Sequence, residues 1–114
     1  RLAECVVETQ KDIKEHGLIA PIVGHVGDGN FHTSPVLAAN DPAARAKMEG
    51  FLERLAARAI SMDGTCTGEH GIGQGKMKYL KSELGSGLEV MRQIKRALDP
   101  LNIMNPGKIV ALTE

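Results

Sequence analysis

The sequence is poor in aromatic residues: it has one tyrosine, two phenylalanines and no tryptophan. Its hydrophobic core is therefore expected to consist mainly of aliphatic side chains. The chain also lacks net charge, because 14 lysine and arginine residues balance 14 aspartate and glutamate residues. A neutral chain has no excess of basic residues to bind a phosphate backbone, so we expect no nucleic-acid partner.

Long apolar runs are absent as well. No stretch approaches the roughly 18 uninterrupted apolar residues of a membrane-spanning helix, and the first residues lack the apolar region of a signal peptide. Cys5 and Cys66 are too few for a disulfide framework, and we expect them to be free thiols in a reducing, cytoplasmic compartment. The chain does not begin with methionine, so we expect a fragment of a longer protein.

What is present is the composition of a folded domain. Of the 114 residues, 42% are hydrophobic and 25% are charged, and the length suits one domain. Periodicity and composition predict helices over residues 2–16, 42 to about 61, 77–84 and 88–98, and strands over 18–26, 31–37 and 64–67. Ser86 and Glu89 have the spacing of a capping box. This order predicts an α+β fold, in which helices cover a small antiparallel sheet. The sheet is short of strands, so further strands would come from an absent N-terminal part or a partner chain.

Glycine and histidine are clustered in this sequence. Eight of the 13 glycines fall within residues 24–32 and 64–75. The same two windows hold three of the four histidines, His25, His32 and His70. Such clustering suggests backbone held in special conformations around reactive side chains.

The pair Asp28-Gly29 predicts a two-residue hairpin turn, because tight turns favour these residue types. With that turn, His25 lies directly opposite His32, and directly opposed Cβ atoms are about 4.5–5.5 Å apart. Two imidazoles at that distance can bind one metal ion, for which Glu69 is the candidate third ligand. Two histidines and one carboxylate accept zinc, and equally iron or manganese. A structural histidine pair on an ordinary hairpin is the alternative.

His70 directly follows Glu69 and is a candidate general base, because histidine side chains titrate near neutral pH. A solvent-exposed loop histidine is the alternative. Asp28 is assigned to the turn rather than to catalysis, and Cys66 to a small buried position. The glycine-rich loop lacks the pattern of a phosphate-binding loop, because Met77 stands where that pattern needs serine or threonine.

Three motifs follow one another between residues 18 and 110. They are HVGDGNFH at 25–32, GTCTGEHGIG at 64–73, and LDP at 98–100 followed by NPGK at 105–108. Together they resemble the C-terminal domain of FAD-linked oxidases, whose members include cytochrome-type D-lactate dehydrogenases, glycolate oxidase subunits and D-2-hydroxyglutarate dehydrogenases. The resemblance implies that residues 1–114 are a fragment of a ferredoxin-like C-terminal domain. This domain contributes to the substrate cap and to metal binding, and the N-terminal FAD-binding domain lies outside the chain.

The resemblance also implies an activity, the FAD-dependent and divalent-metal-assisted oxidation of a D-2-hydroxy acid such as D-lactate to a 2-oxo acid. The family's motifs assign metal binding to His25, His32 and Glu69, catalysis near the substrate carbon to His70, and cofactor binding to Asn105. Zinc ranks first among the metals, followed by manganese and iron. Ser34 replaces a substrate-binding asparagine of some relatives, so no substrate contact is assigned there. FAD is held mainly by the absent domain, and the fragment alone is expected to be inactive.

The partners implied are a small 2-hydroxy acid and an electron acceptor such as cytochrome c or a quinone. Association with the inner membrane, or a mitochondrial location in a eukaryote, is implied beside the cytoplasmic one. An exposed sheet edge also makes a homodimer a hypothesis. Two alternatives stay open: a stand-alone metal-binding or dimerisation module without catalysis, and a non-haem iron oxygenase that uses the same two histidines and carboxylate.

Overall fold

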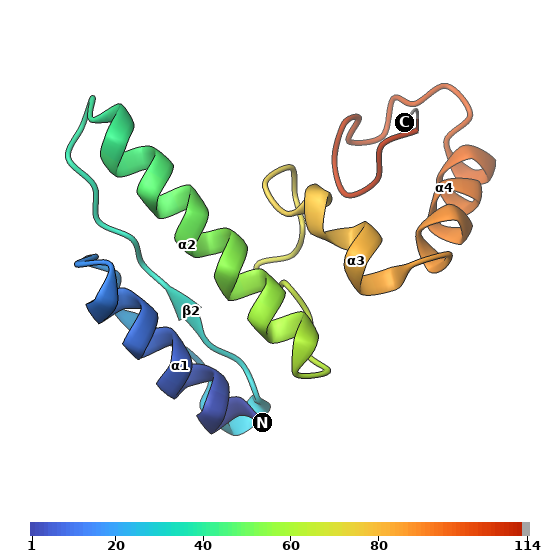
Figure 1. Ribbon diagram of the computed structural model, residues 1–114. Helices are drawn as coiled ribbons and strands as arrows, with labels where there is room; N and C mark the ends of the chain where they lie inside the picture. The colour runs from blue at the N-terminus through green and yellow to red at the C-terminus, as the bar shows by residue number, and fades with distance from the viewer. Residues whose placement is uncertain (113–114) are drawn as a thin grey trace. The chain divides into compact units, whose positions relative to one another are not determined.

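A computed structural model describes residues 1–112 (Figure 1). They form two compact units, one over Arg1–Gly64 and one from Thr65 onwards. The first unit contains α1 (Leu2–Glu15), β1 (Ile22–Val23), the 3₁₀ turn η1 (Val26–Asp28), β2 (His32–Thr33) and α2 (Pro42–Ser61). The second contains the 3₁₀ turn η2 (Met77–Tyr79), α3 (Leu80–Leu84) and α4 (Gly87–Leu98).

The two helices of the first unit begin and end where the sequence predicts. α1 ends at Glu15 with His16 as its C-cap, and Gly17 follows at φ 58°, a left-handed conformation that glycine adopts without strain. α2 begins with Pro42, and the Asp41 side chain accepts a hydrogen bond of 3.0 Å from the backbone N–H of Ala44. Proline in the first turn and aspartate as the N-cap are both typical helix starts, and they confirm the predicted boundary.

The sheet of the first unit is a two-stranded antiparallel hairpin, in which Ile22 is opposite Thr33. Two further backbone hydrogen bonds of 2.8 Å extend this pairing towards residues 19 and 36. Pro21 and Pro35 lack the N–H groups that a longer regular ladder needs. The antiparallel sheet is confirmed, but its strands are shorter than predicted.

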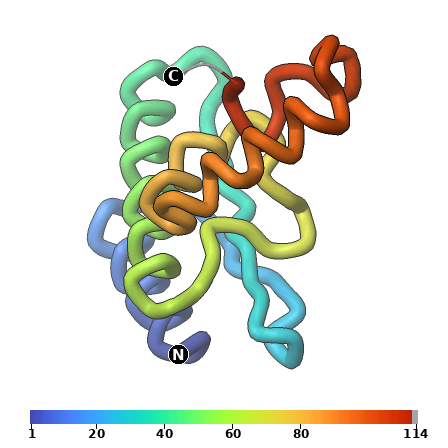
Figure 2. Tube along the Cα trace, turned by 90° about the vertical axis from the view of Figure 1, so that its right-hand side faces the viewer, coloured from blue at the N-terminus to red at the C-terminus, as the bar shows by residue number. Residues whose placement is uncertain are grey.

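The helices and the hairpin of the first unit pack around Phe51, whose side chain is fully buried. Ala20 and Met48 complete this buried cluster, and Ile13 and Leu55 pack against it. Figure 2 shows α1 and α2 on the same side of the hairpin. The hairpin that carries two of the histidines is therefore supported by a helical layer.

The second unit is built on short helices around a separate apolar cluster. Leu80, Leu88 and Val110 form its buried part, and Cys66 and Ile72 are among the residues that pack against it. The predicted helices in this part of the chain are confirmed. The cluster joins the end of the chain and the glycine-rich loop to the helices.

Two local predictions in the second half of the chain are wrong. Residues 64–67 form no strand, because the backbone N–H of Cys66 bonds to a side chain, that of Glu83, instead of a neighbouring strand. Ser86 precedes α4 in a helical conformation (φ −67°, ψ −19°) and makes no side-chain capping bond. A capping side chain needs an extended N-cap residue, so the predicted capping box does not form.

Across residues 1–112, we find no helix with both the length and the apolar character needed to cross a bilayer. The described residues contain four α-helices and one small antiparallel sheet. The predicted α+β class is therefore confirmed.

Candidate functional site

The hairpin carries His25 and His32, but it does not place them directly opposite each other. His32 is opposite Val23, and the turn contains four residues rather than two. The N–H of Asp28 donates to the carbonyl of His25 at 2.9 Å, and Gly29 ends the turn at φ 73°. The predicted two-residue turn and its register are therefore wrong.

A close backbone approach at Gly24 explains this register. A Cβ atom at position 24 would lie 2.4 Å from the Cα of Phe31 and 2.6 Å from the carbonyl oxygen of Asn30. Only glycine permits such an approach. His25 and His32 are consequently offset along the hairpin by two positions, a diagonal spacing of about 7–8 Å in a regular antiparallel pair. Long side chains can still bridge that distance.

His70 lies in a loop of the second unit, which we call the His70 loop (residues 66–73). The loop is closed by its own hydrogen bonds. The N–H of Gly71 donates to the carbonyl of Gly68 at 3.2 Å, and the Thr67 hydroxyl donates to the carbonyl of Gly71 at 2.6 Å. Gly71 has a φ of 76°, a conformation that other residues adopt only with strain. The glycines of this motif therefore serve the shape of a tight loop.

Glu69 and His70 project from this loop with exposed side chains. The side chain of Glu69 is 42% exposed and that of His70 is 66% exposed. The Oε1 atom of Glu69 lies 3.7 Å from the Nε2 atom of His70. The second unit thus presents a carboxylate and an imidazole side by side, where both can reach a ligand.

Glu83 of α3 holds the start of the His70 loop. Its Oε2 atom accepts a hydrogen bond of 2.9 Å from the backbone N–H of Cys66. Burial raises the pKa of Glu83, but the hydrogen bonds from the Cys66 backbone, the Thr65 hydroxyl and the Cys66 thiol outweigh burial, so that the pKa lies below its usual value. Burial, followed by the hydrogen bond to Glu83, raises the pKa of the Cys66 thiol to about 11.

Asn105 lies in a segment that Asp99 organises. The carboxylate of Asp99 accepts hydrogen bonds from the backbone N–H of Ile103 at 3.0 Å and of Met104 at 2.9 Å. Lys95 donates to Asp99 and, at 2.5 Å, to the carbonyl of Met104. Asn105 itself is exposed and has a φ of 49°, which asparagine tolerates better than most residues. The sequence pattern identifies Asp99 only as the end of a helix.

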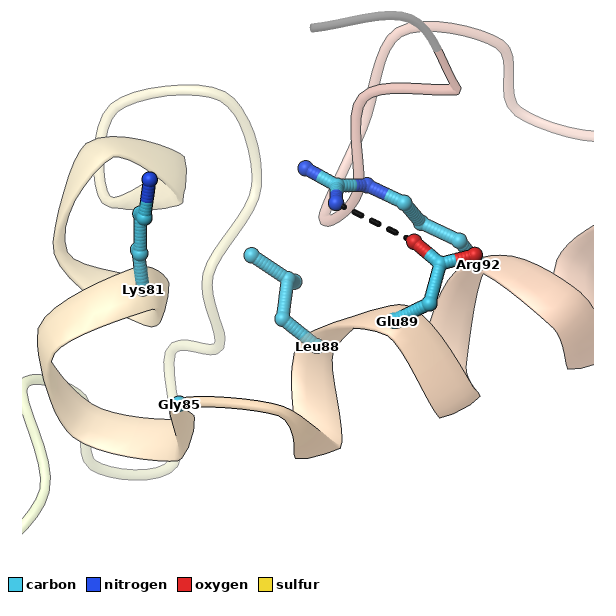
Figure 3. Close-up of a pocket in the computed structure, with 5 residues that line it drawn as sticks. All are labelled: Lys81, Gly85, Leu88, Glu89 and Arg92. Carbon is cyan, nitrogen blue, oxygen red and sulfur yellow. Dashed lines mark hydrogen bonds and ion pairs between the residues drawn. The ribbon is translucent and has the colours of Figure 1, made fainter.

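An open pocket lies between α3 and α4 of the second unit (Figure 3). It is lined by Lys81, Gly85, Leu88, Glu89 and Arg92. Arg92 donates to Glu89 at 3.3 Å, so these two charged side chains of the pocket are paired with each other. No predicted site residue lines the pocket, and we therefore do not assign it to the site.

The predicted site residues belong to both units of the chain. His25 and His32 lie in the first unit, whereas Glu69, His70 and Asn105 lie in the second. Glu69 and His70 are side by side, and Asn105 occupies a different turn of the second unit. Metal binding by His25, His32 and Glu69 stays a prediction.

Comparison with known proteins identifies the family. Residues 1–109 match the model of FAD linked oxidases, C-terminal domain. The chain is 52% identical over 115 residues to a probable mitochondrial D-lactate dehydrogenase of Danio rerio. This alignment covers 100% of this chain and 23% of the relative. It is 46% identical over 110 residues to the mitochondrial D-lactate dehydrogenase (cytochrome) of Arabidopsis thaliana, covering 96% of this chain and 19% of the relative. The glycolate oxidase subunit GlcD of Bacillus subtilis is 39% identical to the chain over 89 residues. This alignment covers 77% of this chain and 19% of the relative.

The chain therefore belongs to the FAD-linked oxidase family, as part of its C-terminal domain. This confirms the membership that the three motifs predict. The chain spans about a fifth of the length of the curated relatives it matches.

Proposed function

We propose that this chain is the C-terminal part of an FAD-dependent dehydrogenase that oxidises a D-2-hydroxy acid, similar in size to D-lactate, to a 2-oxo acid with the help of a divalent metal. The observation that carries the proposal is the family match over residues 1–109, together with relatives of 46% and 52% identity that are named D-lactate dehydrogenases. In this proposal residues 1–114 contribute to the substrate cap. The FAD-binding domain belongs to the portion of the relatives' length that this chain does not cover.

His25, His32 and Glu69 are of the residue types that suit a divalent metal. His25, His32 and Glu69 would hold the ion through two imidazole nitrogens and one carboxylate oxygen. Catalytic zinc sites use such a set, and manganese and iron accept it, with zinc as the first candidate. Glu69 is exposed enough to serve as a ligand. A bound divalent ion supplies Lewis-acid polarisation of the substrate hydroxyl, which makes its proton easier to remove.

His70 would remove the hydroxyl proton of the substrate. Its imidazole is 66% exposed and follows a proposed metal ligand directly in the chain, so a substrate held at the metal would lie near it. A ring nitrogen of His70 accepts the proton as general base. The reaction also removes the hydrogen at C2 with two electrons, for which bound FAD supplies the acceptor. Asn105, exposed in the turn after Asp99, would contact the cofactor.

The relatives' names support a path for the electrons and a location. The Arabidopsis protein and a yeast protein of 48% identity are both named D-lactate dehydrogenase (cytochrome) and mitochondrial. We therefore place cytochrome c before a quinone as the electron acceptor of this protein. A mitochondrial location, in a eukaryotic source, belongs to the same proposal.

The test uses the full-length flavoprotein and two variants, His70→Ala and His32→Ala. Under anaerobic conditions, we expect D-lactate to bleach the flavin absorbance of the wild-type protein. Removal of a general base slows this step by about 10²- to 10⁴-fold in His70→Ala. By elemental analysis, we expect the metal in the wild-type protein and little of it in His32→Ala. Unchanged bleaching in both variants rejects the proposal.

A further inference from the structure

Glu69 and His70 stand between two points at which the His70 loop is fixed. Cys66 and Ile72 both pack against the apolar cluster that contains Leu80, which is only 3% exposed. Between these contacts, the side chains of Glu69 and His70 are exposed. The positions of the two reactive groups therefore depend on how the loop leaves its two fixed points.

Apolar contacts hold a chain close to a surface, but they do not set the direction of its peptide groups. A hydrogen bond does, and the one between the Cys66 N–H and the Glu83 carboxylate is 2.9 Å long. The Thr65 hydroxyl and the Cys66 thiol also bond to this carboxylate. Charged acceptors form hydrogen bonds that are roughly twice as strong as neutral ones. Glu83 is therefore the group that orients the first peptide of the loop.

Glu83 is itself held in place, because it belongs to α3 and not to a loop. It lies three residues after Leu80 on the same short helix, and residues at that spacing are neighbours on a helix surface. The buried side chain of Leu80 anchors the helix in the apolar cluster. The apolar cluster of the second unit thus holds α3 in place, and with it the Glu83 carboxylate that orients the start of the loop.

Beyond Cys66 the loop is braced by its own contacts. The Thr67 hydroxyl, which bonds to the carbonyl of Gly71, also accepts a hydrogen bond of 3.3 Å from Nζ of Lys76. The N–H of Ile109 donates to the carbonyl of Gly73 at 2.8 Å. These bonds link the residues of the loop to one another, so we expect a rotation at Cys66 to displace the residues that follow.

We propose that Glu83 is a positioning residue, which sets the placement of Glu69 and His70 through the backbone of Cys66. This inference rests on the proposed function, because it concerns the metal ligand and the general base of that reaction. When residues that orient metal ligands without binding the metal are removed, metal affinity or activity typically falls by 10- to 100-fold. An error of about 1 Å in the position of a catalytic group has an effect of similar size.

The experiment compares Glu83→Ala and Glu83→Gln in the full-length flavoprotein with the control Glu89→Ala. Glu89 is a glutamate of the same unit, and its ion pairs among the described residues are with Arg92 and Arg96, outside the His70 loop. Three quantities are measured: amide hydrogen exchange over residues 66–73, the anaerobic rate of flavin reduction by D-lactate together with KM, and metal retention against a chelator.

For Glu83→Ala we expect at least tenfold faster exchange at Cys66, a 10- to 100-fold slower flavin reduction with a smaller change in KM, and a comparable loss of metal affinity. Glu83→Gln retains an oxygen that accepts the Cys66 N–H, so it gives intermediate values. It also carries the test where the alanine variant does not fold. Glu89→Ala leaves all three quantities unchanged.

Wild-type exchange in both Glu83 variants overturns the inference, and so does a reduction rate that falls only in proportion to the loss of folded protein. Failure of the proposed function has a different signature. A His70→Ala variant that reduces its flavin at the wild-type rate overturns both ideas. A slow His70→Ala variant beside normal Glu83 variants overturns only the positioning role.

Discussion

Asp12 on α1 and Arg54 on α2 form a two-pronged ion pair within the first unit. Nε of Arg54 lies 3.0 Å from Oδ2 of Asp12, and Nη2 lies 2.6 Å from Oδ1. Asp12 is only 5% exposed, and Arg58 adds a bond of 2.8 Å to Oδ2. The hydrogen bonds from Arg54, opposed by burial and reinforced by Arg58, lower the pKa of Asp12 to about 2. This pair ties together the two helices that support the hairpin.

We expect this pair to make the stability of the protein depend on pH in the acid range. The folded pKa of Asp12, about 2, lies below the ordinary value of 3.8, so its stabilising effect is present above pH 5 and is lost as the pH falls towards 2. The shift corresponds to about 2 kcal/mol. Asp12→Asn should lower the free energy of unfolding at pH 7 by about that amount, measured by urea denaturation.

The pH series supplies the contrast for this prediction. Asp12→Asn should also flatten the dependence of unfolding free energy on pH between 5 and 2. Glu8→Gln, at an exposed position paired only with Lys11 among the described ion pairs, is the control and should change stability by about 0.5 kcal/mol or less. A variant at position 12 with the wild-type acid dependence would contradict the role of the pair.

Gly24 should be irreplaceable for a steric reason. In Gly24→Ala the new Cβ would lie 2.4 Å from the Cα of Phe31, and backbone cannot move aside as a flexible side chain can. We expect a loss of roughly 1–3 kcal/mol of unfolding free energy, as for overpacking elsewhere. Gly27→Ala is the matched control, because a Cβ there meets nothing within 4 Å. Equal denaturation midpoints for the two variants would argue against the close backbone approach between Gly24 and Phe31.

Local signals were sufficient to predict the helices of this fold from sequence. Asp41 and Pro42 mark the start of α2, and Gly17 follows the end of α1, because helix ends are decided by residues adjacent in the chain. The glycines of residues 68–75 likewise predict a loop rather than a regular element, and the structure has no helix or strand there. These features need no knowledge of distant contacts.

The features that the sequence did not predict depend on partners far apart in the chain or on the course of the backbone. The hairpin register follows from the approach of Gly24 to Phe31, which overrides the turn preference of Asp28-Gly29. Glu83 bonds to a residue 17 positions earlier, and no spacing rule marks such a pair. Ser86 and Glu89 have the residue types and spacing of a capping box, but Ser86 lacks the backbone conformation that a cap requires.

The Cys66 thiol should react slowly with alkylating agents. Burial, followed by its hydrogen bond to Glu83, raises the pKa of Cys66 from 9.0 to about 11, and only the thiolate is nucleophilic. At pH 8 the thiolate fraction therefore falls by roughly 100-fold, and the rate with iodoacetamide falls with it. Mass spectrometry of the labelled peptide measures the rate, with the urea-unfolded protein as reference. A folded rate within about threefold of the unfolded one would show that the thiol is not protected.

The hairpin histidines should determine metal content even though they are not direct opposites. In the full-length protein, His25→Ala and His32→Ala each remove one of three proposed ligands, so we expect metal affinity to fall at least tenfold in both, as outer-shell changes alone reach 10- to 100-fold. His16→Ala is the control: this histidine ends α1 and its Nδ1 atom lies 2.9 Å from Oδ1 of Asp12, away from the hairpin turn. Competition with a chelator followed by elemental analysis gives the affinity. Because the two hairpin positions are offset diagonally, loss of metal in His32→Ala but not in His25→Ala would mean that His25 is too far along the hairpin to be a ligand. Wild-type affinity in both variants would remove the hairpin from the metal site altogether.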